Sequence, residues 1–183
     1  MLQDRATKKV LLTKQISPEG LELLTEVPWI ETIQLTDNNS TDIESVLKQV
    51  HAIIARSFHV DKNMIQSAKQ LKIIAQHGVG VDYIDVEAAT EAGVYVTNAP
   101  RTNTTSVAEF TISLILLLSK QLINGMRIQK TGQYHLKDKC MGNDIENKVL
   151  GIIGFGNIGK KVAELAHGMG MKVVAYDPYV PSD

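Results

Sequence analysis

Over its first hundred residues the chain alternates between two hydrophobic periods. Between short β-branched runs, apolar positions recur at helical spacing. One helix is expected to begin at Ser17, as the N-cap, followed by Pro18. Another helix is expected at residues 85–92 and to end at Gly93. Strands that are apolar throughout and alternate with helices indicate a parallel sheet covered on both faces, which is an α/β fold. The predicted strands are at residues 10–12, 33–35, 52–55, 72–75 and 94–96.

The pattern changes near residue 100. A loop at residues 98–103 precedes a helix at residues 106–124 that is apolar around nearly all of its circumference. A helix of that kind is buried, so we expect it to lie between domains or subunits. The polar stretch at residues 130–148 predicts an arm or long loop. The predicted domains are therefore residues 1–101 and residues 102–183, the second including the long helix.

From residue 149 the chain has the pattern of a strand, a glycine-rich turn, a helix and a second strand. The strands are at residues 149–153 and 172–176, and the turn has the form G-x-G-x-x-G. In this context the motif predicts dinucleotide binding, whereas the turn alone is equally typical of a plain βα connection. The helix carries an apolar face at a spacing near 3.6, formed by Ile158, Val162, Leu165, Ala166 and Met169.

Each glycine of the motif has a distinct predicted role. Gly154 permits the tight turn, Gly156 lets the backbone approach a pyrophosphate, and Gly159 lets the helix pack closely on the sheet. The N-terminus of the helix then offers free N–H groups and partial positive charge to the anion. Asp177, at the end of the second strand, is placed to accept hydrogen bonds from an adenosine ribose.

Composition and charge narrow the possible partners. There are 19 Lys and Arg against 20 Asp and Glu, without the basic excess of a nucleic-acid-binding protein. The longest apolar run, residues 110–119, is shorter than the roughly 20 residues that span a bilayer, and the first residues lack the apolar stretch of a signal peptide. Cys140 has no second cysteine, and the five histidines show no metal-ligand spacing. We therefore expect a cytoplasmic protein with no metal, nucleic-acid or membrane partner.

Several motifs, in order along the chain, resemble the NAD-dependent D-2-hydroxyacid dehydrogenases. They are Gly78-Val79-Gly80-Val81-Asp82, Asn98-Ala99-Pro100, residues 103–109, residues 150–159 and Tyr176-Asp177-Pro178. The resemblance covers essentially the whole chain. It implies a flavodoxin-like parallel-sheet substrate domain followed by the start of a Rossmann NAD-binding domain, with the active site between them. The implied substrate is a small 2-hydroxy or 2-oxo acid, with 3-phosphoglycerate as the first candidate.

For the substrate, the resemblance implies roles for two segments. Arg56 and Ser57 help to hold the acid group, and the loop of Gly78, Val79 and Gly80 offers backbone N–H groups to the substrate carboxylate. The alternatives are an ordinary surface cation for Arg56 and simple turn glycines for Gly78 and Gly80.

For the cofactor NAD, the resemblance adds further contacts to the glycine motif and Asp177. Val79 also touches the cofactor, Ser106 lies near it, and Asn157 and Ile158 contact the pyrophosphate through the backbone. The alternative for Ser106 is a helix N-cap.

The sequence also departs from the family. Gln76 stands where many relatives have Arg or Lys, and Phe110 where many have His. The family's catalytic Arg, Glu and His have no match among these residues, so we expect the 183 residues alone to be an inactive fragment of the enzyme. The alternative function is a non-catalytic NAD-sensing scaffold of the same fold. The family further implies a homodimer formed through the 106–124 helix and the arm after it.

Overall fold

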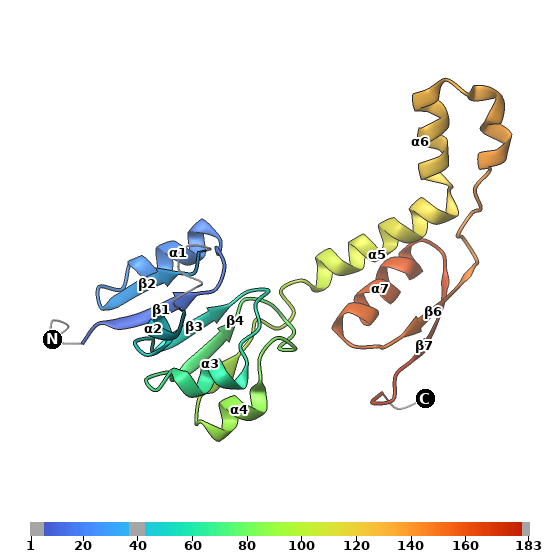
Figure 1. Cartoon of the computed structure of the whole chain (residues 1–183). Helices are drawn as coiled ribbons and strands as arrows, with labels where there is room; N and C mark the ends of the chain where they lie inside the picture. The colour runs from blue at the N-terminus through green and yellow to red at the C-terminus, as the bar shows by residue number, and fades with distance from the viewer. Residues whose placement is uncertain (1–5, 37–42, 181–183) are drawn as a thin grey trace. The chain divides into compact units, whose positions relative to one another are not determined.

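The structure is a computed structural model that describes residues 6–36 and 43–180. The chain forms two compact units, Met1–Pro100 and Arg101–Asp183, called unit 1 and unit 2 below (Figure 1).

Unit 1 is built on a five-stranded sheet in which every pairing is parallel. The strand order is β2-β1-β3-β4-β5, which is the flavodoxin-like order. The predicted α/β fold class is therefore confirmed. The strands are β1 at Lys8–Leu12, β2 at Ile30–Gln34, β3 at Ala52–Ala55, β4 at Ile73–Gln76 and β5 at Tyr95–Thr97.

Short helices with defined caps connect these strands. The Ser17 hydroxyl accepts a hydrogen bond from the Gly20 N–H at 3.3 Å, and Gly93 has a φ of 67°, as the sequence predicted. The helix that begins at Asp61 was not predicted. The helices are α1 at Pro18–Thr25, α2 at Ile43–Leu47, α3 at Lys62–Ser67 and α4 at Val86–Glu91.

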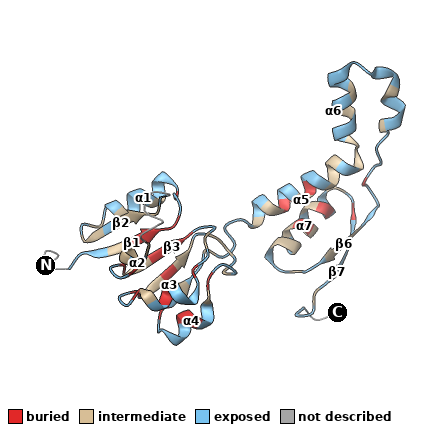
Figure 2. Cartoon of the chain, in the orientation of Figure 1, coloured by how far each residue is buried: buried red, intermediate tan, exposed pale blue. Residues whose placement is uncertain are grey.

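The two faces of the sheet carry separate apolar cores (Figure 2). Leu11, Ile53 and Ile74 pack in one core with residues of α2, α3 and α4. Val10 and Leu12 pack in a smaller core on the other face, which includes Leu24 of α1. The alternation along β1 therefore divides its side chains between the two cores, as a strand in a covered sheet requires.

Unit 2 contains the predicted strand–helix–strand segment. The parallel strands β6, at Val149–Ile153, and β7, at Lys172–Tyr176, flank α7, at Asn157–Gly168. The five predicted apolar positions of α7 all lie in one core, which also contains Ala108 and Ile112 of helix α5. These elements and their packing are confirmed.

The single helix expected at residues 106–124 is wrong in extent. Helix α5 covers Thr104–Ser119, and α6 covers Leu122–Thr131, with a bend of 61° between them. The break lies at Gln121, whose φ of 55° is left-handed. Three polar residues, Ser119, Lys120 and Gln121, stand at this break, and the prediction extended the helix across them because apolar residues resume at Leu122.

Within this chain α5 is only partly buried, and its burial between domains or subunits stays a prediction. Only Ala108 and Ile112 of α5 are buried, while the Phe110 and Leu118 side chains are 64% and 70% exposed. A 3-10 helix at Tyr134–Cys140 occupies part of the predicted polar arm. Among the described residues no single helix is long and apolar enough to span a bilayer, although α5 and its bent neighbour α6 together reach that length and composition.

One buried hydroxyl joins β1 to β3 beyond their last paired residues. The strands pair as far as Leu12 and Ile54, and the Thr13 N–H then donates to the Ile54 carbonyl at 3.1 Å. Thr13 Oγ1 accepts a hydrogen bond from the Arg56 N–H at 2.9 Å and lies 3.5 Å from the Arg56 carbonyl oxygen, to which it donates. Since Thr13 is only 3% exposed, this hydroxyl fixes the start of the loop after β3.

We expect Thr13→Val to lower the free energy of unfolding of unit 1 by about 1–3 kcal/mol, because the Arg56 N–H loses its partner in a buried setting. Trp29, the only tryptophan, lies in unit 1, so urea denaturation followed by its fluorescence measures this change. Thr13→Ser keeps the hydroxyl and should retain slow hydrogen exchange at the Arg56 amide. Equal protection of that amide in the Val and Ser variants would contradict the assignment.

Candidate functional site

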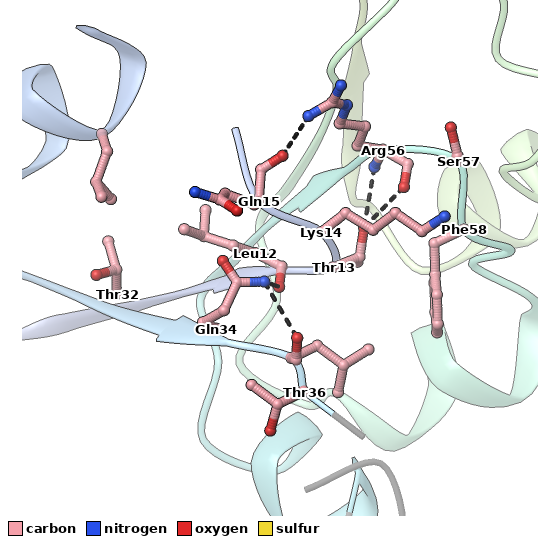
Figure 3. A pocket seen from close by; sticks show the side chains of 12 residues that line it. Leu12, Thr13, Lys14, Gln15, Thr32, Gln34, Thr36, Arg56, Ser57 and Phe58 are labelled. Atoms are coloured by element: carbon pink, nitrogen blue, oxygen red, sulfur yellow. Dashed lines mark hydrogen bonds between the residues drawn. The ribbon is translucent and has the colours of Figure 1, made fainter. Parts of the chain in front are cut away.

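A cavity of unit 1 lies where the strand order reverses. From β1 the chain passes to β2 on one side and then to β3 on the other, and ligands of open α/β sheets bind at the carboxyl ends of strands at such a point. The cavity measures about 960 Å³ (Figure 3). Its lining residues come from the ends of β1, β2 and β3 and from α1: Leu12, Thr13, Lys14, Gln15, Leu21, Thr32, Gln34, Leu35, Thr36, Arg56, Ser57 and Phe58.

Arg56 and Ser57, which the sequence singled out, both line this cavity. The Arg56 guanidinium donates through Nη1 to the Gln15 carbonyl, which fixes one edge of the group and leaves its other donors available (Figure 3). Ser57 has a left-handed φ of 44°. Residues other than glycine adopt this conformation at a cost and are enriched at functional sites.

The loop of Gly78, Val79 and Gly80 follows β4, and two hydrogen bonds to its carbonyl groups hold it in place. Asn98 Nδ2 donates to the Val79 carbonyl at 2.6 Å, and the Ala99 N–H donates to the Gly78 carbonyl at 2.9 Å. Within the described residues the N–H groups of Val79 and Gly80 donate no hydrogen bond. Two fixed, uncommitted donors on one loop are suited to binding a carboxylate.

Gln76, the departure from the family at the end of β4, lies beneath this loop. A Cβ on Gly78 would come within 3.3 Å of Gln76 Nε2. Gln76 Oε1 is buried and has no hydrogen-bond partner among the described residues. A longer side chain at position 78 would therefore displace an amide that the loop packs against.

The glycine-rich turn between β6 and α7 has the backbone that the motif predicts. Gly154 has a φ of 93°, and a Cβ on Gly159 would lie 2.2 Å from the Gly154 carbonyl oxygen. These two glycines are required by the fold itself. A Cβ on Gly156, by contrast, would meet nothing within 4 Å. Contacts within the described residues therefore do not explain a glycine at position 156.

Helix α7 begins directly at this turn. Asn157, Ile158 and Gly159 form its first turn, in which backbone N–H groups have no partner within the helix. The positive end of the helix dipole lies at the same point. The turn and the helix together present donors suited to an anion.

Asp177, directly after β7, is bound to the turn. Its Oδ2 accepts from the Phe155 N–H at 2.6 Å, and its Oδ1 accepts from the Tyr179 N–H at 2.8 Å. The bonds from Tyr179 and then Phe155 lower the pKa of this exposed carboxyl below its usual value. Each oxygen retains a further lone pair for a ligand hydroxyl.

Ser106 lies in the first turn of α5. The helix begins at Thr104 with Asn103 as N-cap, so Ser106 is not the N-cap that the alternative reading required. Its side chain is exposed and forms no hydrogen bond within the described residues.

The residues that follow β1 were missed by the sequence analysis. The rule is that functional groups of an open parallel sheet follow the carboxyl ends of its strands. Applied to the strand at residues 10–12, it would have found Thr13, Lys14 and Gln15, which line the cavity. The described residues contain no cluster of three or more His, Cys, Asp or Glu side chains that could hold a metal ion.

A family model described as D-isomer specific 2-hydroxyacid dehydrogenase, catalytic domain, matches residues 10–175. The chain belongs to this family. Among its dehydrogenase relatives is the D-3-phosphoglycerate dehydrogenase of Methanocaldococcus jannaschii, which is 36% identical over 176 residues. That match covers 96% of this chain and 33% of the relative, so the chain spans about a third of the length of the curated relatives it matches.

Solved dehydrogenase structures share the fold. The NAD-dependent formate dehydrogenase of Staphylococcus aureus, solved in complex with NAD, has a TM-score of 0.80 at 28% identity, covering 94% of this chain and 57% of that one. The NAD+-bound 3-phosphoglycerate dehydrogenase of Entamoeba histolytica has a TM-score of 0.75 at 26% identity, covering 97% of this chain and 56% of that one.

We expect Gly159→Ala to destabilise unit 2 by about 1–3 kcal/mol, since the added Cβ would collide with the Gly154 carbonyl and push α7 from the turn. Hydrogen exchange of α7 peptides measures the loss, and Trp29 fluorescence of unit 1 serves as the internal control. Gly156→Ala, with open space for its Cβ, should leave exchange unchanged. Equal exchange in the two variants would show that the close approach at Gly159 does not constrain the fold.

Proposed function

We propose that this chain supplies the carboxylate-binding and nucleotide-binding parts of an NAD-dependent dehydrogenase that acts on the CH–OH group of a small D-2-hydroxy acid. The observation that carries the proposal is the turn between β6 and α7, with Asp177 bonded to it and Gly156 facing open space. The fingerprint of dinucleotide-binding folds requires this combination of strand, turn, helix and strand-end acid.

The residues of unit 2 fit NAD. Gly156 leaves room for the pyrophosphate, the N–H groups of Asn157 and Ile158 are proposed to bind it, and Gly154 and Gly159 shape the turn. Asp177 has lone pairs left for the adenosine ribose. When bound, NAD accepts a hydride from C2 of the hydroxy acid. Val79 and Ser106 are further proposed cofactor contacts.

The residues of unit 1 fit the substrate. The free N–H groups of Val79 and Gly80, with Gly78 allowing the loop, are proposed to bind the substrate carboxylate. Arg56 and Ser57 add a cation and a hydroxyl at the end of β3. The similarity to D-3-phosphoglycerate dehydrogenases supports 3-phosphoglycerate as the first candidate substrate.

Proton transfer is proposed to need residues outside this chain. None of its histidines matches the family's catalytic histidine, so the 183 residues by themselves are proposed to bind ligands without transferring a hydride. The relatives carry dehydrogenase names, which gives no support to the alternative of an NAD-sensing scaffold.

A homodimer is proposed from the exposed stripe of α5. Phe110, Leu114 and Leu118 are spaced by four residues, and each side chain is between 42% and 70% exposed. Monomers rarely expose a contiguous apolar patch of this kind. Helix α6 continues the apolar surface with Leu122 and Met126.

For the cofactor, we expect the chain to bind NAD at least about tenfold more tightly than NADP, because the ionised Asp177 repels the additional phosphate. Gly156→Val should abolish binding of both dinucleotides, since its side chain occupies the pyrophosphate position, while urea unfolding stays unchanged. Isothermal titration with each dinucleotide measures both effects. Asp177→Ala should bring the two affinities closer together. Unchanged NAD affinity in Gly156→Val would refute the nucleotide site.

For assembly, we expect sedimentation velocity to show a dimer that the double substitution Phe110→Lys and Leu118→Lys converts to a monomer. Two charges in the apolar stripe would have to be buried without partners. Thr105→Lys, at the exposed start of the same helix, is the matched control and should leave the dimer intact. A wild-type chain that sediments as a monomer at every concentration would reject this interface.

A further inference from the structure

His51, directly before β3, holds the amino end of β1 with both its backbone and its side chain. The His51 N–H donates to the Lys9 carbonyl at 2.8 Å, and the Lys9 N–H donates to His51 Nδ1 at 3.2 Å. In a longer parallel pair the Lys9 N–H would bond to a backbone carbonyl of the neighbouring strand, but β3 begins only at Ala52. The imidazole therefore supplies the acceptor that the chain before β3 does not supply.

The hydrogen bond from Lys9 requires a neutral ring. A neutral imidazole has one nitrogen that accepts and one that donates, whereas both nitrogens of a protonated imidazole are donors. His51 Nδ1 can therefore accept from the Lys9 N–H only while Nδ1 carries no proton. Protonation would remove the acceptor and turn two N–H donors toward each other. Histidine is the side chain whose ordinary pKa, about 6.5, makes such a change possible near neutral pH.

Lysines surround His51 at this edge of the sheet. The register of β1, β3 and β4 places Lys9, His51 and Lys72 side by side, and the Lys72 N–H donates to the His51 carbonyl at 2.8–2.9 Å spacing typical of the ladder, here 2.9 Å. Lys8 precedes Lys9 on β1, and Lys48 lies between α2 and His51. A protonated His51 would therefore add a positive charge to a group of positive charges, which is unfavourable.

One carboxylate lies in the same row but is separated from the ring. Glu31 of β2 is opposite Lys9, so β1 stands between Glu31 and His51. Within the described residues no ion pair joins a carboxylate to the His51 ring. Partial burial, followed by the charges of Lys8 and Lys9, lowers the pKa of His51 below its usual value. The folded chain therefore favours the neutral ring that the hydrogen bond needs.

We propose that His51 is an acid-sensitive cap of the β1–β3 pair, which holds the Lys9 N–H when the ring is neutral and releases the start of β1 when the ring is protonated. The proposal does not depend on the proposed function, because the cap lies at the amino ends of strands whose carboxyl ends line the cavity. Since the pKa of His51 is lower in the folded than in the unfolded chain, the unfolded chain binds the proton more readily. The stability that the cap contributes is therefore present above the usual histidine pKa and is lost as the pH falls below it.

The test follows hydrogen exchange of the Lys9 amide in the 15N-labelled 183-residue chain. Between about pH 7.5 and about pH 5.5 its protection factor, which is corrected for the intrinsic pH dependence of exchange, should fall about fivefold, the effect of one hydrogen bond. His51→Asn offers an amide oxygen near the position of Nδ1 that is not protonated in this range, so protection should be equal at both pH values. His51→Leu has no acceptor and should show the lower protection at both.

Two further variants separate the cap from a general effect of acid. His59→Gln replaces an exposed histidine of the same unit and should keep the wild-type loss of Lys9 protection. Lys8→Gln removes a neighbouring charge and should raise the pH at which the His51 ring titrates by NMR. In the wild type the Lys9 amide and the His51 ring should change with one midpoint. Different midpoints, or equal protection of the Lys9 amide at both pH values, would overturn the proposal.

Discussion

Parallel pairing of β1 with β3 is the constraint on which the site in unit 1 depends. Because both strands run in the same direction, their carboxyl ends meet at one edge of the sheet, and the segments after them must share that edge. Beyond the paired residues, the Thr13 hydroxyl continues the connection between the two chain segments by accepting a hydrogen bond from the Arg56 N–H. The Arg56 guanidinium is then held by the Gln15 carbonyl, which also follows β1, and the left-handed Ser57 comes next in the chain.

In unit 2 the corresponding constraint is the backbone contact at Gly159. Helix α7 can begin close to β6 only because no side chain separates Gly159 from the Gly154 carbonyl. The same closeness brings the Phe155 N–H within hydrogen-bond distance of Asp177 at the end of β7. Asp177 is therefore part of the turn as well as a candidate ligand of ribose, and the hydrogen bonds that it accepts from Tyr179 and Phe155 lower its pKa.

Sequence reasoning was most reliable where backbone geometry restricts the residue type. Gly93, Gly154 and Gly159 stand where a positive φ or a close contact excludes a side chain, so the elements around them could be located. It failed at Gln121, where a left-handed residue separates α5 from the apolar positions that resume at Leu122. Positive φ is uncommon for residues other than glycine, so the residue type did not indicate a left-handed backbone there.

The cavity was missed for a different reason. Lys14 is one of many lysines in the sequence, and its place in the cavity lining depends on the strand order, which puts β1 between β2 and β3. Once that order is known, the charge of the lining follows from twelve residues drawn from four separate elements. The residue types of the lining can be read from the sequence, but only the strand order brings them together at one edge of the sheet.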